Sequence, residues 1–199
     1  MNKELIKNLK FKIKNCQKGY TLVELLAVII ILITVGTIIT SILVTSLRGG
    51  NKSNTTNDVR QNGNYIITQM SKMILYAKSF DGVSRDNSVG SYISDCIVIQ
   101  PPPPALPLAP VPYKYIKISS FDGGQTIFSC ANGTISSGSA ALLSSNFSVT
   151  SCNFYCTQTN LLSVPTININ FTLSKANAGF FVENQTIIPF ETSITPRNN

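Results

Sequence analysis

The stretch that decides the fold is 18-KGYTLVELLAVIIILITVGTIITSILVTSL-47. From Leu25 to Leu47, 23 consecutive residues carry no charge. A helix of that length spans about 34 Å at about 1.5 Å per residue, enough to cross a hydrocarbon core about 30 Å thick. The run is longer than the apolar region of a cleaved secretory signal, about 7–15 residues, and it lacks the small-residue cleavage site. We therefore expect a membrane-spanning helix that is retained.

The positive charge of the chain is concentrated before this helix. The net charge of +7 alone would suggest a nucleic-acid partner, but residues 1–19 hold six lysines and one glutamate, which is +5 of the total. The other 180 residues hold ten basic and eight acidic side chains, or +2, so nucleic-acid binding is not supported. By the positive-inside rule, residues 1–19 should lie in the cytoplasm and residues 48–199 outside. The expected localisation is a single-pass protein of the cytoplasmic (inner) membrane.

One acidic residue, Glu24, stands at the beginning of the apolar run. A carboxylate within a membrane segment costs up to a few kcal/mol unless it finds a partner, and is therefore a functional candidate. At the start of a helix it could instead lie at headgroup level, where its charge suits the helix dipole. The position of Glu24 alone leaves both interpretations open.

Residues 18–26, Lys-Gly-Tyr-Thr-Leu-Val-Glu-Leu-Leu, resemble the class III signal of type IV prepilins and type II secretion pseudopilins. That signal is a basic leader ending in Gly, an aromatic residue, and then Thr-Leu-(Ile/Val)-Glu-Leu-Leu. The resemblance implies that a prepilin peptidase cuts after Gly19 and that the new N-terminal residue, Tyr20, is N-methylated. It also implies that Glu24 pairs with the terminal amine of a neighbouring subunit. Two opposite charges neutralise one another in a low dielectric, so this pair would favour one axial register between sliding helices.

The chain departs from the family at one point in this helix. Many major pilins carry a proline about midway, where the helix locally melts on assembly. Here the corresponding region, residues 36–41, reads Gly-Thr-Ile-Ile-Thr-Ser. The sequence leaves open whether the helix bends there.

Past the membrane the helix is expected to continue into the soluble domain as an amphipathic helix. Apolar residues recur every seven positions with others between them, which is the stripe of an amphipathic helix. The residues of this stripe are Val59, Ile66, Met70, Met73, Ala77 and Phe80. The pair Asp81-Gly82 should end the helix, while Gly63 should weaken it somewhat.

After residue 82 the apolar pattern changes to period two, which is typical of strands. The clearest strand alternates Ile167, Ile169, Phe171 and Leu173 with polar residues; weaker alternations are Ile97/Ile99, Ile116/Ile118 and Phe190/Thr192/Ile194. Asp122-Gly123-Gly124 is a hairpin signal. The expected fold class is therefore α+β and pilin-like, with a long N-terminal membrane-spanning helix packed on an antiparallel β-sheet.

The expected organisation follows from these segments. It comprises a cleaved leader (1–19), a transmembrane and assembly helix (20–47), an amphipathic helix (48–81) and an extracytoplasmic β-rich domain (82–199) with a proline-rich loop (100–112). That loop has seven prolines in thirteen residues, which favours polyproline II and excludes a central strand. A stiff surface loop is favoured over a recognition ligand.

The cysteines support an outside location for the domain. Cys16 would leave with the leader, and four would remain: Cys96, Cys130, Cys152 and Cys156. An even set outside the cell favours two disulfides, because a zinc or redox site would be expected to contain C-x-x-C pairs.

The connectivity of these cysteines depends on the backbone between the last two. If that segment is extended, the Cα atoms of Cys152 and Cys156 lie about 13 Å apart, too far for the limit of about 7 Å, and both bonds run to other strands. If the chain turns at Asn153, a local Cys152–Cys156 bond forms and Cys96 must meet Cys130. The apolar alternation changes parity near Thr150-Ser151, which favours the extended alternative.

Catalysis finds little support in the sequence. There is no histidine, which removes the commonest general base and metal ligand, so we expect no enzyme activity, no cofactor and no metal.

The ending 190–198 also resembles the closing strand of PilW-like or pseudopilin J-like minor subunits. The expected function is a structural minor pilin or pseudopilin of a type IV pilus-like or type II secretion-like filament. The alternative is an adhesin or DNA-uptake minor pilin that acts as a binding module.

The resemblance also implies the partners of such a subunit. They are other pilin or pseudopilin subunits, the prepilin peptidase, an inner-membrane assembly platform and membrane lipid. After assembly the protein would lie in an extracellular or periplasmic filament.

Overall fold

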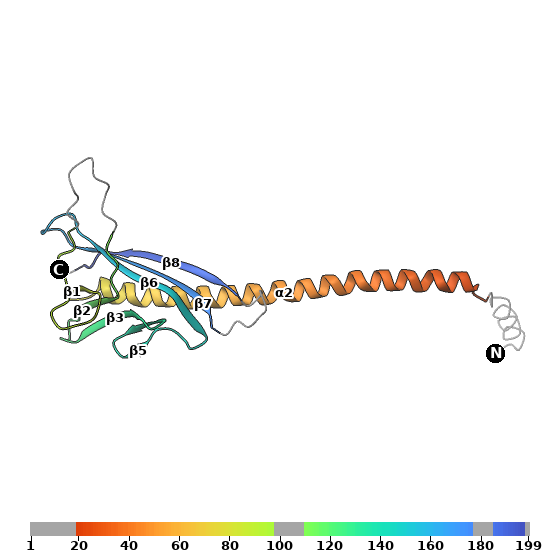
Figure 1. The fold of residues 1–199 in the computed structure, drawn as a ribbon, viewed down its shortest axis with the longest axis horizontal. Helices are drawn as coiled ribbons and strands as arrows, with labels where there is room; N and C mark the ends of the chain where they lie inside the picture. The colour runs from red at the N-terminus through yellow and green to blue at the C-terminus, as the bar shows by residue number, and fades with distance from the viewer. Residues whose placement is uncertain (1–18, 98–109, 177–184, 198–199) are drawn as a thin grey trace, which may run out of the picture. The chain divides into compact units, whose positions relative to one another are not determined.

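The computed structural model describes residues 19–97, 110–176 and 185–197. Residues 1–18 of the expected leader, with Cys16, lie outside the described residues, as do residues 98–109, which hold Ile99 and most of the expected proline-rich loop. The chain divides into two compact units, Met1–Arg48 and Gly49–Asn199. The described elements are one long helix and eight strands, in agreement with the predicted α+β class (Figure 1).

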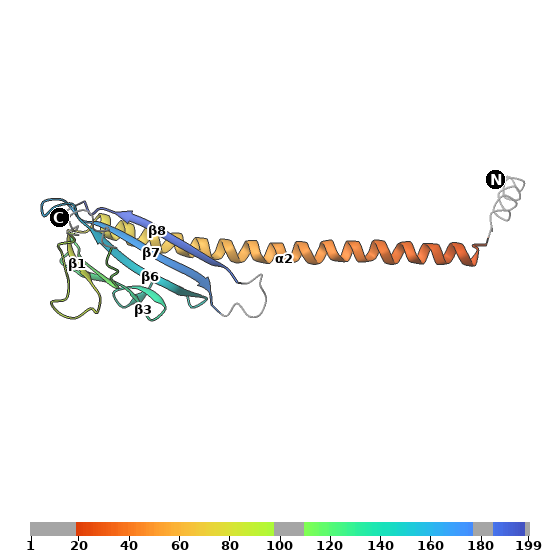
Figure 2. The same cartoon turned by 45° about the horizontal axis from the view of Figure 1, so that its top comes forward.

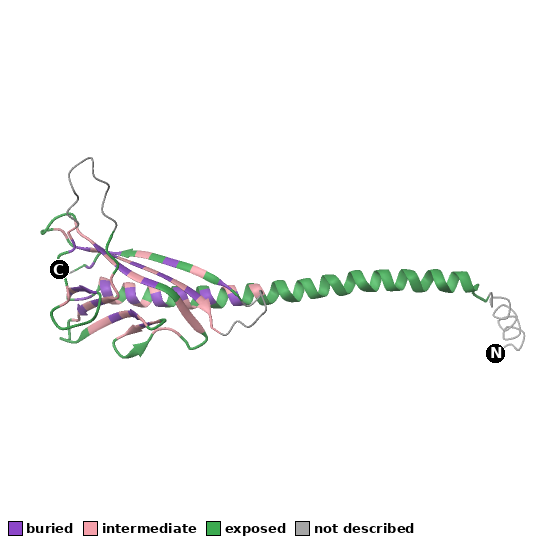
Figure 3. Cartoon of the chain, in the orientation of Figure 1, coloured by how far each residue is buried: buried purple, intermediate pink, exposed green. Residues whose placement is uncertain are grey.

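The helix, α2, runs without interruption from Leu22 to Leu75, 54 residues. The region that has no midway proline, residues 36–41, is helical throughout. In the first unit every described residue of the helix is exposed, as the green ribbon of Figure 3 shows. In the second unit one face of the helix is buried. The buried residues of this face are spaced three or four apart, at Thr55, Val59, Gly63, Ile66, Met70 and Ile74.

The expected end of the helix at Asp81-Gly82 is wrong. The helix ends at Leu75, and Phe80 is buried from a strand, β1 (Ser79–Ser84). Gly82 has a φ of 125°, at a shift in the register of β1 against its neighbour. A Cβ on Gly82 would lie 2.7 Å from the carbonyl oxygen of Ile93. This glycine therefore serves a β-bulge and a close backbone approach, not a helix stop.

The strands form two antiparallel sheets, where the sequence suggested one. The first sheet has the order β1-β2-β3-β4-β5, with β2 at Tyr115–Ser119, β3 at Gln125–Ala131, β4 at Thr134–Ser137 and β5 at Ala140–Ala141. The predicted hairpin joins β2 to β3, where Ser119 faces Gln125 and Gly123 takes a φ of 84°. Ile97 forms only an isolated bridge to Gln158.

The second sheet has the order β6-β7-β8, seen most clearly in Figure 2. Its strands are β6 (Phe147–Thr157), β7 (Thr166–Lys175) and β8 (Ile187–Ile194). The predicted alternation in β7 is confirmed, because its four apolar residues are all fully buried. The buried residues of α2 and of both sheets belong to one hydrophobic cluster. Two sheets suit this helix because each has an apolar face that must be covered.

Candidate functional site

The segment that precedes α2 contains the two residues of the expected processing site. Gly19 and Tyr20 are both exposed, with 78% of the Tyr20 surface accessible. A Cβ built at Gly19 would meet no atom of the described residues within 4 Å. The fold therefore places no steric demand for glycine at this position.

Thr21 caps the N-terminus of α2. Its hydroxyl oxygen accepts a hydrogen bond from the backbone N–H of Glu24 at 3.3 Å, and its carbonyl accepts from the N–H of Leu25 at 3.1 Å. Thr-x-x-Glu is the pattern of a capping box. Reasoning from the sequence missed this role of Thr21, although a threonine three residues before a glutamate is its usual signal.

The Glu24 carboxylate is not used by the cap. Among the described residues, no side chain or backbone N–H forms a hydrogen bond or ion pair with it, and Glu24 is exposed. The bond to Thr21 involves only the backbone N–H of Glu24. The cap therefore leaves the carboxylate exposed, without a partner among the described residues.

The helix beyond Glu24 is long and apolar enough to cross a membrane. Threonine hydroxyls within it donate to backbone carbonyls of the same helix at 2.8–2.9 Å, from Thr34, Thr37, Thr40 and Thr45. Such bonds satisfy hydroxyl groups where no water is present. The exposed apolar side chains need lipid or protein around them. The hydroxyls of these four threonines are therefore satisfied within the helix itself.

Residues 14–46 match the family model of the prokaryotic N-terminal methylation motif. This segment is a class III signal of the type IV pilin and pseudopilin kind. The match covers the last basic residues, the Gly19-Tyr20 pair, Glu24 and nearly all of the apolar run. Comparison with curated proteins and with solved structures found no match. The class III signal and the apolar helix fit a membrane-anchored pilin, and the roles of Gly19, Tyr20 and Glu24 stay predictions.

Two disulfides lie in the domain that follows the class III signal. Cys96 joins Cys156 and Cys130 joins Cys152, with Cα atoms 5.4 and 5.5 Å apart. Cys152 and Cys156 are buried on the same face of the continuous strand β6 and do not bond to each other. The register of β6 shifts between Val149 and Ser151, where the change in parity was expected.

The Cys130–Cys152 bond connects the two sheets, since it links β3 to β6.

Within the part of the chain that the structure describes, no group of three or more His, Cys, Asp or Glu residues could hold a metal ion.

Proposed function

We propose that the protein is a minor pilin or pseudopilin, a structural subunit of a type IV pilus-like or type II secretion-like filament. The observation that carries this proposal is the class III signal at residues 14–46, followed directly by an exposed apolar helix and a β-rich domain. The 180 residues that remain after removal of the leader, with a proline-rich insertion, favour a minor subunit over the major one.

In this proposal a prepilin peptidase removes residues 1–19, and Tyr20 becomes the methylated N-terminus. Residues 20–47 then hold the subunit in the inner membrane, with residues 48–199 outside, until an assembly platform moves it into the filament. The exposed apolar side chains of the helix would then leave lipid for contact with other subunits.

Glu24 would set the register of that contact. An ion pair at about 4 Å is worth about 1 kcal/mol in water and about 4 kcal/mol at an effective dielectric constant of 20. Away from water, an unpaired carboxylate or an unpaired amine would cost more than a mismatch between apolar side chains. One axial position between neighbours, in which the Glu24 carboxylate meets a terminal amine, would therefore be preferred.

The assembly role is tested by substitutions at Glu24 in cells that hold the rest of the assembly machinery. Glu24→Gln removes the charge but keeps the length and polarity of the side chain, whereas Glu24→Ala removes the polar side chain altogether. Asp58→Asn is the matched control, because Asp58 is an exposed acid of the same helix outside the apolar span.

Both Glu24 variants should insert and be cleaved, yet their amount in sheared filaments should fall at least tenfold. Asp58→Asn should behave as the wild type. Normal incorporation of Glu24→Gln would contradict the ion pair, and equal loss in Asp58→Asn would show a general effect of charge.

A further inference from the structure

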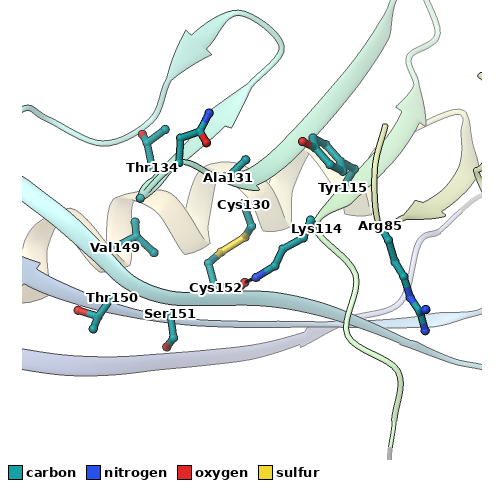
Figure 4. Close-up of a pocket in the computed structure, with 12 residues that line it drawn as sticks. Arg85, Lys114, Tyr115, Cys130, Ala131, Thr134, Val149, Thr150, Ser151 and Cys152 are labelled. Atoms are coloured by element: carbon teal, nitrogen blue, oxygen red, sulfur yellow. Dashed lines mark hydrogen bonds between the residues drawn. A yellow bond between two sulfur atoms is a disulfide. The ribbon is translucent and has the colours of Figure 1, made fainter. Parts of the chain in front are cut away.

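The turn that joins β3 to β4 consists of Asn132 and Gly133 and forms one wall of a cleft of about 360 Å³. Figure 4 shows the two residues that flank this pair, Ala131 and Thr134, which face each other in the strand register. Asn132 and Gly133 are both exposed. Water therefore reaches the turn, and the cleft leaves room for a small molecule to depart from it.

The geometry of the hairpin accounts for the choice of these two residues. Because Ala131 pairs with Thr134, the loop between the strands has only two residues. Their φ angles are both positive, 53° at Asn132 and 69° at Gly133. Asn-Gly is the preferred sequence for a two-residue hairpin with this backbone. The fold therefore places a residue without a side chain directly after an exposed asparagine.

An asparagine that precedes a glycine can react with its own backbone. The nitrogen of Gly133 attacks Cγ of Asn132, a new C–N bond forms, and the side-chain amide leaves as ammonia with the proton of the attacking N–H. The product is a cyclic succinimide, which glycine permits because it has no Cβ to obstruct the approach. Water then opens the ring. Addition at Cγ gives aspartate, and addition at the backbone carbonyl gives isoaspartate.

The reacting groups of the turn are not held by hydrogen bonds. Among the described residues, none accepts a hydrogen bond from the N–H of Gly133 or bonds to the Asn132 side chain. The carbonyl of Gly133 accepts from the N–H of Val149 at 3.1 Å, but this bond does not occupy the reacting nitrogen. The attack requires rotation of the Asn132 backbone. Since β4 has only four residues, a local opening of this exposed turn is sufficient.

The chain holds a second Asn-Gly pair, Asn62-Gly63, in the opposite environment. It lies inside α2, where the side-chain amide of Asn62 donates to the carbonyl of Asp58 at 2.9 Å. Gly63 is buried against the ring of Phe190, and backbone N–H groups inside an α-helix are used by the helix itself. Reaction at this pair would require the helix to unfold and to lose its packing.

We propose that Asn132 is a site of spontaneous deamidation in the folded protein, from which Asn62 is protected. The reaction consumes only water and converts a neutral amide at the cleft wall into a carboxylate. The aspartate product keeps the turn, because aspartate accepts a positive φ. The isoaspartate product adds a backbone carbon to the two-residue loop and so breaks its register. This modification goes beyond the filament role and does not depend on it.

Peptide mass spectrometry of the purified full-length protein measures both sites after incubation in detergent micelles and mildly alkaline buffer. The change from amide to acid raises the peptide mass, and electron-transfer fragmentation separates aspartate from isoaspartate. We expect Asn132 to deamidate at least tenfold faster than Asn62, with isoaspartate among the products. In concentrated guanidinium chloride, where turn and helix are both unfolded, the two rates should become similar.

Two substitutions test the part played by the glycine. Gly133→Asn keeps a residue that accepts a positive φ, and its Cβ would meet only the carbonyl of Val149 at 3.9 Å. The added side chain obstructs the attack and should slow deamidation of Asn132 at least tenfold. Gly138→Asn is the matched control, because Gly138 has a φ of 61° and an open Cβ position, and it should leave the rate unchanged. Near-UV circular dichroism checks that both variants are folded.

Equal rates at Asn132 and Asn62 in the folded protein would overturn the proposal. So would an Asn132 that reacts in guanidinium chloride but not in the folded protein. An unchanged rate in Gly133→Asn would contradict attack by the backbone nitrogen of residue 133.

Discussion

The ring of Phe190 packs directly against the backbone of α2 at Gly63. A Cβ built on Gly63 would lie 2.1 Å from Cζ of Phe190, far inside van der Waals contact. The ring also stacks on Phe171 of β7 with centroids 5.2 Å apart, so it has little freedom to move away. The absence of a side chain at Gly63 therefore allows the Phe190 ring of the second sheet to lie against the helix backbone, which accounts for a glycine inside this helix.

Gly63→Ala should destabilise the protein. Overpacking costs about 1–3 kcal/mol, while the gain in helix propensity returns about 1 kcal/mol, so a net loss of about 1 kcal/mol is expected. Gly50→Ala is the matched control, because it lies in the same helix with no atom within 4 Å of its Cβ position. That variant should be neutral or slightly stabilising. Urea unfolding of the full-length protein, followed by near-UV circular dichroism, measures the free energy of unfolding of both variants.

A second substitution tests whether contact with the Phe190 ring causes the destabilisation by Gly63→Ala. In a Phe190→Leu background, the smaller side chain leaves room for a methyl group, so Gly63→Ala should become neutral or stabilising. If the alanine is as destabilising in that background as in the wild type, contact with the ring is not the cause.

Peptide mapping under non-reducing conditions should recover the pairs Cys96–Cys156 and Cys130–Cys152. A single peptide with an internal Cys152–Cys156 bond would contradict the extended form of β6.

The two bonds close loops with sequence separations of 60 and 22 residues. By chain entropy they contribute about 4 and about 3 kcal/mol, so loss of Cys96–Cys156 should lower the free energy of unfolding more.

Asp86 should titrate well below an ordinary aspartate. The backbone N–H of Ser88, followed by the hydroxyls of Ser91 and Ser88, lowers the pKa of its carboxyl from 3.8 to about 2. Because the folded pKa is depressed, the contribution of Asp86 to stability is present above pH 3.8 and is lost as the pH falls towards 2.

Carboxyl-carbon NMR titration of Asp86 checks this pKa directly. Ser88→Ala removes the hydroxyl donor, which stands 2.9 Å from Oδ1, and should raise the pKa while the backbone donor remains. A wild-type midpoint near 3.8 would contradict the hydrogen-bonded geometry of this loop.

The sequence predicted those parts of the fold that depend on a local period or on a motif. The uncharged run and the amphipathic stripe after it predicted the long helix, strict alternation predicted β7, and Asp122-Gly123-Gly124 predicted the hairpin between β2 and β3. The change in parity near Thr150 predicted a break at the place where the register of β6 shifts, and favoured an extended segment in which Cys152 and Cys156 do not pair.

The errors arose where a residue's role depends on distant partners. Phe80 lies seven residues after Met73 and so matches the helical spacing. It belongs to strand β1, which begins soon after the helix ends, and the match in spacing is a coincidence. The sequence predicts a helix stop at Asp81-Gly82, but glycine is needed at position 82 because the backbone of Ile93, on another segment, lies against it. The division into two sheets is likewise decided by which strand edges meet, and the period-two pattern contains no information on that.

N-terminal processing tests the central claim most directly. Intact-mass and N-terminal peptide mass spectrometry of the protein from its native cells should show the loss of residues 1–19 and one methyl group on Tyr20. Gly19→Leu should block cleavage, because the peptidase must approach the backbone at that residue. Gly36→Leu, which changes an equally unobstructed glycine of the apolar span, should be cleaved normally. A mature wild-type chain that begins elsewhere, or that keeps residues 1–19, would contradict the assignment as a filament subunit.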